Sequence, residues 1–194
     1  MQVLCSPAGA LWRSHHDKDI SKFLSYVLRH APESIGLALD PQGWASVDEL
    51  LEKANASGRA LDLETLQRVV AQSDKKRFTF AAGGQRIRAA QGHSVAVDLG
   101  LAPSVPPDEL YHGTAAATVP AILAEGIVPG RRQQVHLSAT PEVARAVGQR
   151  HGKPVVLRIA CARMQADGFA FTQAENGVWL TDRVPTAYLA VMEG

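Results

Sequence analysis

The sequence is poor in cysteine and has no long apolar run. Its only cysteines, Cys5 and Cys161, stand in no CxxC or metal-ligand spacing, which excludes a disulfide framework and favours a reducing, cytoplasmic compartment. No stretch approaches the ~20 apolar residues of a membrane-spanning helix, so no membrane partner is expected. His15 and His16 are adjacent and have no cysteine or carboxylate at ligand spacing, so no metal is expected.

Strong net charge and the usual nucleotide-binding loops are also missing. The net charge is +1 and hydrophobic residues make up 46% of the chain, which is typical of a globular protein of one or two domains. Any contact with nucleic acid must therefore be local. No GxGxxG occurs, so a Rossmann NAD site has no support. The segment GQRHGK has one residue too few between its glycines for a P-loop, and Pro154 follows where Ser or Thr would bind magnesium.

The first half has the pattern of a small helical domain with a hairpin. Apolar residues recur at three- and four-residue spacing in the first and third helical segments, and Ala31-Pro32 ends the first of them. Asp48 and Asp62 are candidate caps for the second and third helices, and the segments RFTF and QRIRA flank AAGG as the arms of a hairpin. The expected elements are helices at 17–30, at 48–54 and from 62 to 70, a short strand at 37–39, and a hairpin around 81–84.

Three helices followed by a hairpin is the order of a winged helix, so residues 17–98 are predicted to form a winged-helix lobe. Residues 1–16 are expected to be a flexible extension. A solvated basic surface is the alternative to an RNA-binding wing, and composition alone favours it. The basic residues of the hairpin region are Lys75, Lys76, Arg77, Arg86 and Arg88.

The second half begins with a linker and then becomes richer in β-forming residues. Residues 99–109 contain three prolines, which indicates a linker. The mixture that follows over residues 110–194 is typical of an α+β lobe with a mostly antiparallel sheet. The expected strands are at 110–112, 135–137, 155–159, 169–172, 178–180 and 188–191, with helices near 116–125 and 141–151.

Three arginines and one histidine lie beside apolar elements and are candidates for handling phosphate: Arg29, His30, Arg77 and Arg132. Guanidinium groups bind phosphate oxygens in pairs and stay charged, and histidine exchanges protons near neutral pH. For Arg29 and His30 the alternative is a helix end whose cations complement the helix dipole. The residues alone leave both interpretations open.

Several sequence blocks together identify a family. With them the chain resembles the RNA 2'-phosphotransferases, NAD-dependent enzymes that remove the 2'-phosphate left at a tRNA splice junction. The resemblance implies NAD as co-substrate, RNA bearing a 2'-phosphate as partner, and an ADP-ribosyltransferase-like second lobe; we expect a monomer. The blocks, in order, are SKFLSYVLRH, GLALDPQGWASVDELL, KKRF, IRAAQGHS, PDELYHGT, RQQVHLS, VGQRHGKPVVL and NGVWLTDRVP.

The resemblance also assigns the phosphate ligands. In this family an Arg-His-Arg-Arg set engages the 2'-phosphate, and the LRH and KKRF blocks place its first three members at Arg29, His30 and Arg77. The spacing to VHLS favours Arg132 over its neighbour Arg131 as the fourth member. His30 is a candidate proton shuttle or phosphate ligand, and the sequence does not separate the two roles. Two lysines are assigned to the RNA, with the first also implicated in the second chemical step: Lys75 and Lys76.

The NAD contacts follow from two further blocks. YHGT resembles the first signature of the ADP-ribosyltransferases, which implies that His112 and Thr114 hold the adenosine ribose side of NAD while Gly113 lets the backbone approach. VHLS resembles the second signature, with Ser138 facing the nicotinamide ribose. Val178 stands where many ADP-ribosyltransferases have a glutamate that holds the ribose 2''-hydroxyl. Our hypothesis is that valine leaves this hydroxyl free to attack the phosphate.

The implied enzyme is a transferase of phosphorus-containing groups that works in two steps, through an ADP-ribosylated phosphate, and releases nicotinamide, 2'-hydroxyl RNA and ADP-ribose 1'',2''-cyclic phosphate. One alternative is a mono-ADP-ribosyltransferase of phosphate ends or protein, which would have no use for Arg29-His30 and Arg77. Another is an NAD-sensing winged-helix nucleic-acid-binding protein, which would bind without releasing nicotinamide.

Overall fold

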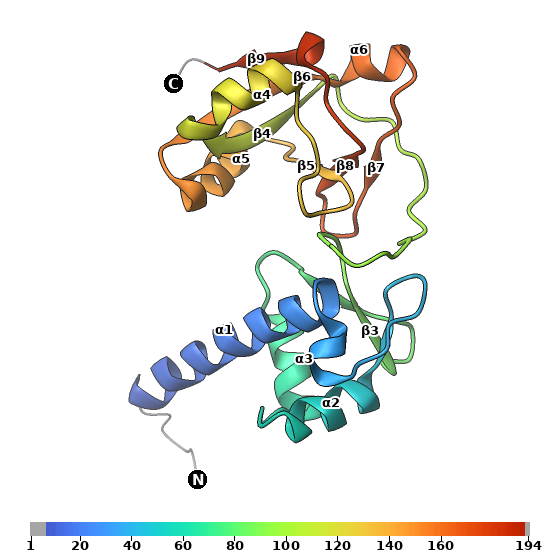
Figure 1. Cartoon of the computed structure of the whole chain (residues 1–194). Helices are drawn as coiled ribbons and strands as arrows, with labels where there is room; N and C mark the ends of the chain where they lie inside the picture. The colour runs from blue at the N-terminus through green and yellow to red at the C-terminus, as the bar shows by residue number, and fades with distance from the viewer. Residues whose placement is uncertain (1–6, 193–194) are drawn as a thin grey trace. The chain divides into compact units, whose positions relative to one another are not determined.

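The computed structural model describes residues 7–192, with side chains described for residues 16–192. The chain divides into two compact units, an N-terminal unit, Met1–Leu99, and a C-terminal unit, Gly100–Gly194 (Figure 1). The division falls at the start of the proline-rich segment. Each unit has a hydrophobic core of its own.

The N-terminal unit contains three α-helices followed by a hairpin, in the predicted order. Strands β2 and β3 pair antiparallel, and a short strand β1 joins them to give the sheet order β1-β3-β2. The elements are α1 (Pro7–Arg29), the 3-10 helix η1 (Pro32–Ile35), β1 (Ala45–Ser46), α2 (Val47–Ala56), α3 (Leu63–Ala71), β2 (Phe78–Phe80) and β3 (Arg86–Ala89).

Apolar side chains from all three helices and the sheet form the core of this unit. Leu24 and Leu28 of α1 are fully buried, as are Leu50 of α2, Leu66 of α3 and Ile87 of β3. Burying such a side chain contributes about 1.5–3 kcal/mol. The core therefore holds the C-terminal end of α1, where Arg29 lies, firmly against the sheet.

Three of the predictions for this unit need correction. Helix α1 begins at Pro7 and not at Asp17, so residues 7–16 of the expected extension are helical, while residues 1–6 lie outside the described part. Asp48 is inside the first turn of α2, and the cap is Ser46, whose hydroxyl accepts from the Glu49 backbone N–H at 3.4 Å. No strand forms at 37–39, where the Ala38 backbone N–H donates to the Glu49 carboxylate.

The cap predicted for the third helix is confirmed. The Asp62 carboxylate accepts from the Thr65 backbone N–H at 2.8 Å, which satisfies one of the free N–H groups at the start of α3. The bond also lowers the pKa of Asp62. An aspartate followed by an apolar helical stripe was a sufficient signal here.

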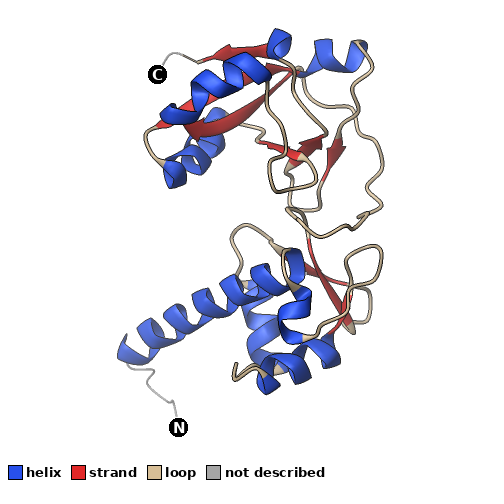
Figure 2. Ribbon diagram, viewed as in Figure 1, coloured by secondary structure: helices blue, strands red, loops and turns tan. Residues whose placement is uncertain are grey.

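The C-terminal unit combines short helices with antiparallel strands, as predicted, but the strands form two sheets and not one (Figure 2). The sheet orders are β4-β6-β9 and β5-β8-β7. Its elements are β4 (Glu109–Ala115), η2 (Ala116–Thr118), α4 (Val119–Glu125), β5 (Val135–Leu137), α5 (Pro141–Gly148), η3 (Gln149–His151), β6 (Pro154–Ala160), α6 (Cys161–Ala166), β7 (Thr172–Gln173), β8 (Trp179–Thr181), η4 (Thr186–Tyr188) and β9 (Leu189–Val191).

Strand β7 is shorter than predicted, because the backbone before it bonds to other partners: the Phe171 carbonyl accepts from the Ser104 N–H at 2.8 Å. Phe171 is buried in the core, and Phe169 makes an edge-on contact with Tyr188 at 5.6 Å between ring centroids. The ladder with β8 therefore starts only at Thr172. The two sheets are joined where the backbones of Tyr111 and Ser138 exchange hydrogen bonds at 2.9 and 2.7 Å.

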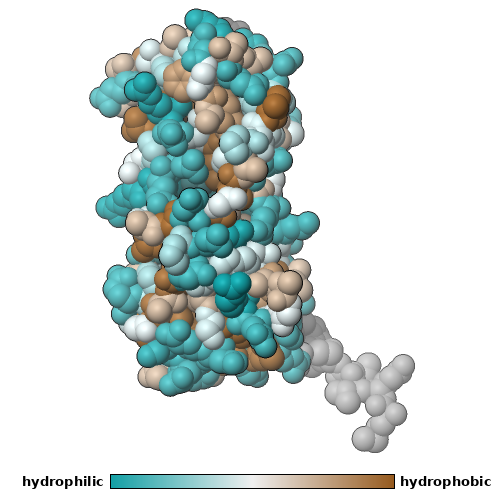
Figure 3. All heavy atoms as spheres, turned by 90° about the vertical axis from the view of Figure 1, so that its right-hand side faces the viewer, coloured by the Kyte–Doolittle hydropathy of each residue, from teal (hydrophilic) through white to brown (hydrophobic). Residues whose placement is uncertain are grey.

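The surface is mixed in character. The face drawn in Figure 3 is largely hydrophilic, with hydrophobic residues in small separate areas. Single exposed apolar side chains of this kind, such as Val105 and Val128, are normal for a protein surface. Within residues 7–192, none of the helices has the length and apolar character needed to cross a membrane.

Candidate functional site

The end of α1 is held by the segment that follows β3. The Arg29 carbonyl, one of the free acceptors at the helix end, accepts from the backbone N–H groups of Ser94 at 2.9 Å and Val95 at 3.3 Å. The His30 N–H still bonds to the Tyr26 carbonyl at 2.9 Å, so the last turn is complete. These bonds fix the backbone from which Arg29 and His30 project.

The Arg29 side chain lies beside the backbone of Arg77. Its Nη2 donates to the Arg77 carbonyl at 3.4 Å, and its guanidinium lies 5.9 Å from the centroid of the Phe78 ring. A side chain added at Gly92 would come within 3.7 Å of the same guanidinium. Two arginines that are 48 positions apart in sequence are therefore neighbours.

A tight turn before β2 determines the position of Arg77. The Lys76 N–H donates to the Ser73 carbonyl at 2.8 Å, and Lys76 has φ of 40°, a left-handed conformation that costs a non-glycine residue about 1–3 kcal/mol. The Ser73 hydroxyl accepts from both the backbone N–H and Nη1 of Arg77, each at 3.4 Å. Lys75 and Lys76 are exposed in this turn.

The ring of His30 contacts a hydroxyl that can take either role in the bond. His30 Nδ1 is 3.0 Å from Ser94 Oγ, which also lies 3.5 Å from the Arg29 carbonyl. When the hydroxyl donates to that carbonyl, Nδ1 must donate to the hydroxyl oxygen, and Nε2 is left as the group that meets a ligand. In the alternative rotation the Ser94 hydroxyl donates to Nδ1, which then accepts, and the proton of the neutral ring lies on Nε2.

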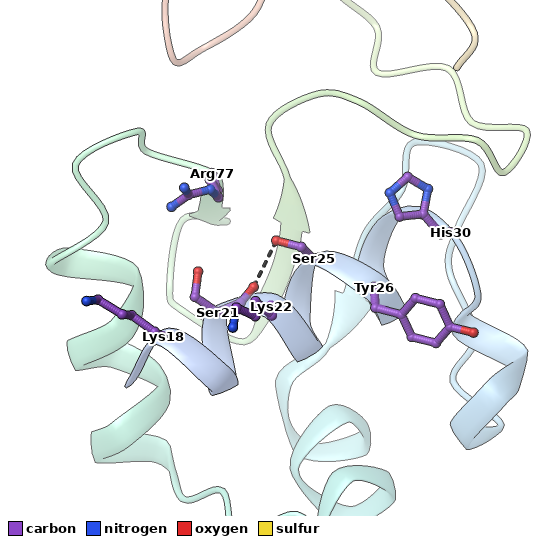
Figure 4. A pocket seen from close by; sticks show the side chains of 7 residues that line it. All are labelled: Lys18, Ser21, Lys22, Ser25, Tyr26, His30 and Arg77. Carbon is purple, nitrogen blue, oxygen red and sulfur yellow. Dashed lines mark hydrogen bonds between the residues drawn. The ribbon is translucent and has the colours of Figure 1, made fainter. Parts of the chain in front are cut away.

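His30 and Arg77 line one pocket of about 390 Å³ on the N-terminal unit (Figure 4). The rest of its lining comes from α1 and consists of lysine, serine and tyrosine side chains. Arg29 is not part of the lining and reaches this region through its contact with the Arg77 carbonyl. The remaining lining residues are Lys18, Ser21, Lys22, Ser25 and Tyr26.

A second pocket, of about 510 Å³, lies on the C-terminal unit. Its wall includes the predicted residues His112, Gly113 and Thr114, together with both Arg131 and Arg132. A volume of this size is in the usual range for small-molecule sites. Ser138 is not part of the wall; its backbone pairs with Tyr111, next to His112.

His112 is held as a neutral imidazole. Its Nδ1 is 3.1 Å from the His136 carbonyl, and because a carbonyl only accepts, Nδ1 must carry the proton. Burial lowers the pKa of His112, and the charge of Arg132 lowers it further against the opposing effect of that hydrogen bond. Nε2 is therefore an acceptor, which suits a hydroxyl donor such as that of a sugar.

Arg131 and Arg132 differ in their electrostatic effect on His112. Both line the pocket, but it is the charge of Arg132 that acts on His112. Partial desolvation by the surrounding wall also lowers the pKa of Arg132. Neither effect concerns phosphate binding, so the choice of Arg132 over Arg131 from sequence spacing stays a prediction.

Three residues near the predicted phosphate ligands received no role from the sequence. Ser94 contacts His30, Ser73 contacts Arg77, and His93 is 3% exposed with no hydrogen-bond partner on Nε2 among the described residues. Burial, then the charges of Arg29, His30 and Arg88, lower the pKa of His93 to about 4. The block IRAAQGHS contained His93 and Ser94, but nothing in its pattern distinguishes a positioning residue from a packed one.

Comparison with known proteins identifies the family of this chain. Residues 15–183 match the family described as RNA 2'-phosphotransferase, Tpt1/KptA. A protein of Agrobacterium fabrum named "Probable RNA 2'-phosphotransferase" is 66% identical over 171 residues, which cover 88% of this chain and 92% of the relative. Proteins with the same name from Acaryochloris marina and Pseudomonas aeruginosa are 53% and 56% identical, over 91% and 88% of this chain and 97% and 94% of their own. The predicted resemblance is thereby confirmed, and the chain belongs to the RNA 2'-phosphotransferase, Tpt1/KptA family.

Proposed function

We propose that this enzyme removes a 2'-phosphate from RNA by transferring it to NAD. The observation that carries the proposal is the grouping of Arg29, His30 and Arg77 on the N-terminal unit, with the pocket beside them. Paired guanidiniums and an imidazole are the groups that bind a phosphate dianion and exchange its protons. The three helices and hairpin that carry them fit a winged-helix lobe.

The second pocket is the proposed NAD site, on an ADP-ribosyltransferase-like unit. The neutral His112 offers an acceptor for a ribose hydroxyl, with Gly113 and Thr114 beside it, and Ser138 is assigned to the nicotinamide ribose. Arg132 from the same wall is the fourth phosphate ligand. RNA carrying the 2'-phosphate and NAD are thus the two substrates, and no metal is required by this chemistry.

In the first step, an oxygen of the RNA 2'-phosphate attacks C1'' of NAD, and nicotinamide leaves with the electron pair of the glycosidic bond. Nicotinamide departs as a neutral molecule, so it needs no proton. The residues' task is to position the phosphate and support the developing positive charge on the ribose.

In the second step, the ribose 2''-hydroxyl attacks the phosphorus, and O2' of the RNA leaves and takes up a proton. The products are 2'-hydroxyl RNA and ADP-ribose 1'',2''-cyclic phosphate. Arg29, Arg77 and Arg132 neutralise charge on the phosphoryl oxygens, Lys75 assists from the turn, and His30 shuttles the proton or binds the phosphate. Val178, directly before β8, leaves the 2''-hydroxyl unrestrained.

The test is to incubate the protein with NAD and an oligonucleotide bearing an internal 2'-phosphate, and to follow nicotinamide, RNA and the cyclic phosphate. We expect all three products, with losses of about 10²–10³ in rate for Arg29→Ala, Arg77→Ala and Arg132→Ala. Arg131→Ala is the matched control and should retain most activity. Stable ADP-ribosylated RNA as the final product would instead support a mono-ADP-ribosyltransferase, and NAD binding without nicotinamide release would support a sensor.

A further inference from the structure

We infer that the surface of α1 leading away from His30 is a binding track for single-stranded RNA that flanks the 2'-phosphate. The inference rests on the proposed function and extends it from one phosphate to a stretch of RNA. The track consists of the pocket residues contributed by α1, namely Lys18, Ser21, Lys22, Ser25 and Tyr26.

These residues recur with the spacing of one helical face. Lys18 and Lys22 are four apart, as are Ser21 and Ser25, so each pair lies on successive turns. A rise of about 1.5 Å per residue puts Lys22 about 12 Å and Lys18 about 18 Å from His30 along the helix. Figure 4 shows the serines between Lys18 and His30, with Arg77 on the same side of the helix. The pocket thus continues from the predicted phosphate ligands along more than one nucleotide of a strand.

The charge of the track suits a polyanion. None of its described lining residues is acidic. Asp17, next to Lys18 in the sequence, is held by Arg68, with 3.0 Å from Nη2 to Oδ1 and 3.3 Å from Nε to Oδ2. Lys22 is paired with Asp19 at 3.3 Å, but both side chains are mostly exposed, 80% and 64%. Such a pair stabilises little, so Lys22 can exchange it for an RNA phosphate.

The other groups of the track contact RNA without reading its sequence. Ser25 Oγ donates to the Ser21 carbonyl at 2.8 Å, which leaves its oxygen to accept from a ribose 2'-hydroxyl. Tyr26 is 52% exposed and offers an aromatic face on which a base can stack. The described lining has no Asn, Gln, Asp or Glu to read base edges, and its lysines act toward phosphates as point charges. Binding along the track should therefore depend on length and salt, and little on sequence.

The experiment compares a short substrate with a long one. The short one is a 2'-phosphorylated dinucleotide and the long one a single strand of about ten nucleotides with the same phosphate, and KM and kcat are measured for each. We expect the double variant Lys18→Ala/Lys22→Ala to raise KM for the long substrate about tenfold, to leave kcat unchanged, and to leave both constants unchanged for the dinucleotide. The charge-matched control is Lys53→Ala/Lys153→Ala, two lysines outside the pocket.

Direct binding keeps the inference testable apart from the reaction. In fluorescence anisotropy with an unphosphorylated ten-nucleotide strand, the slope of log affinity against log salt should fall by about 1.4 for the double variant, because each phosphate contact contributes about 0.7. Tyr26→Ala should weaken binding, and Tyr26→Phe should restore it. Equal KM values for both lengths in the parent, or equal effects of the double variant and its control, would overturn the track. No turnover of either substrate by the parent would instead defeat the proposed function, while the anisotropy result would still decide on the track.

Discussion

Replacing Gly113 by alanine should be among the most disruptive single-methyl changes in the C-terminal unit. A Cβ at this position would lie 1.6 Å from the Ala144 carbonyl oxygen and 2.4 Å from its carbon, both in the backbone of α5. Even a tight contact of 3.0 Å would require α5 to move by about 1.4 Å. Overpacking of ordinary side chains costs about 1–3 kcal/mol, and here the obstacle is a helix backbone that has no rotamer to change. We therefore expect a loss of at least about 3 kcal/mol.

Differential scanning calorimetry can test this value. For a unit of this size, each kcal/mol lowers the melting temperature by about 4–8 °C, so the C-terminal transition should fall by about 12 °C or more. Gly130→Ala is the control, because a Cβ there meets no atom within 4 Å and its cost is limited to the backbone strain of φ +65°. If Gly113→Ala melted no lower than Gly130→Ala, the close packing of β4 on α5 would not be the reason for glycine.

Three further predictions concern groups outside the pocket linings. The pKa of His93 is about 4, so between pH 6.5 and 4 the native state binds fewer protons than the unfolded state. The free energy of unfolding is complete above pH 6.5 and should fall by about 3 kcal/mol as the pH is lowered to 4. In urea titrations, His93→Gln should flatten this dependence. Burial raises the pKa of Cys161 to about 12, so in a Cys5→Ser background Ellman's reagent at pH 8 should react with the thiol only after denaturant is added. Prompt reaction of the native protein would contradict this burial. The ion pair between Asp17 and Arg68, whose side chains are 18% and 28% exposed, should give a coupling of about 1 kcal/mol in a double-mutant cycle, and additivity of the single changes would show that it contributes nothing.

Local signals in the sequence were sufficient for most of the fold. The aspartate before α3, the glycine-rich turn between β2 and β3, and the proline after α1 each act within a few residues, and each had the predicted effect. The cap of α2 was misplaced by two residues because Ser46 and Asp48 are both good capping types, and which of them caps depends on where the strand β1 ends. The helix before Asp17 was missed because PAGALWRSHH carries no strong apolar stripe.

The sequence predicted candidate site residues, three of which lie close together in the structure, but it did not predict the contacts that support them. Arg29 and Arg77 were identified from the sequence, whereas the contact of Nη2 with the Arg77 carbonyl depends on a turn with a left-handed lysine. A positive φ at Lys76 has no sequence signal, since glycine or asparagine is the residue usually found there. Likewise, the role of Ser94 depends on a long-range contact with the end of α1, 64 positions away.

Gly113 shows how a motif residue can have a second physical reason beside the one its motif implies, which stays a prediction. The resemblance assigned it to close approach of the backbone to NAD, whereas the structure gives it a steric role against α5, and the two roles make different demands. A steric role predicts unfolding on substitution, while a role in NAD approach alone predicts a folded protein with weak NAD binding. Melting and NAD titration of the same variant therefore separate them.

The two histidines of the predicted set differ in chemistry because their partner atoms differ. His112 faces a carbonyl that can only accept, so its proton is fixed on Nδ1, and burial keeps the ring neutral. Its Nε2 can then accept from a hydroxyl donor. His30 faces a hydroxyl that either donates or accepts, so either tautomer of its ring fits the contact. A proton shuttle needs that freedom and a ribose ligand does not, so these partner atoms suit the predicted roles of His30 in phosphate chemistry and of His112 in ribose binding, which stay predictions.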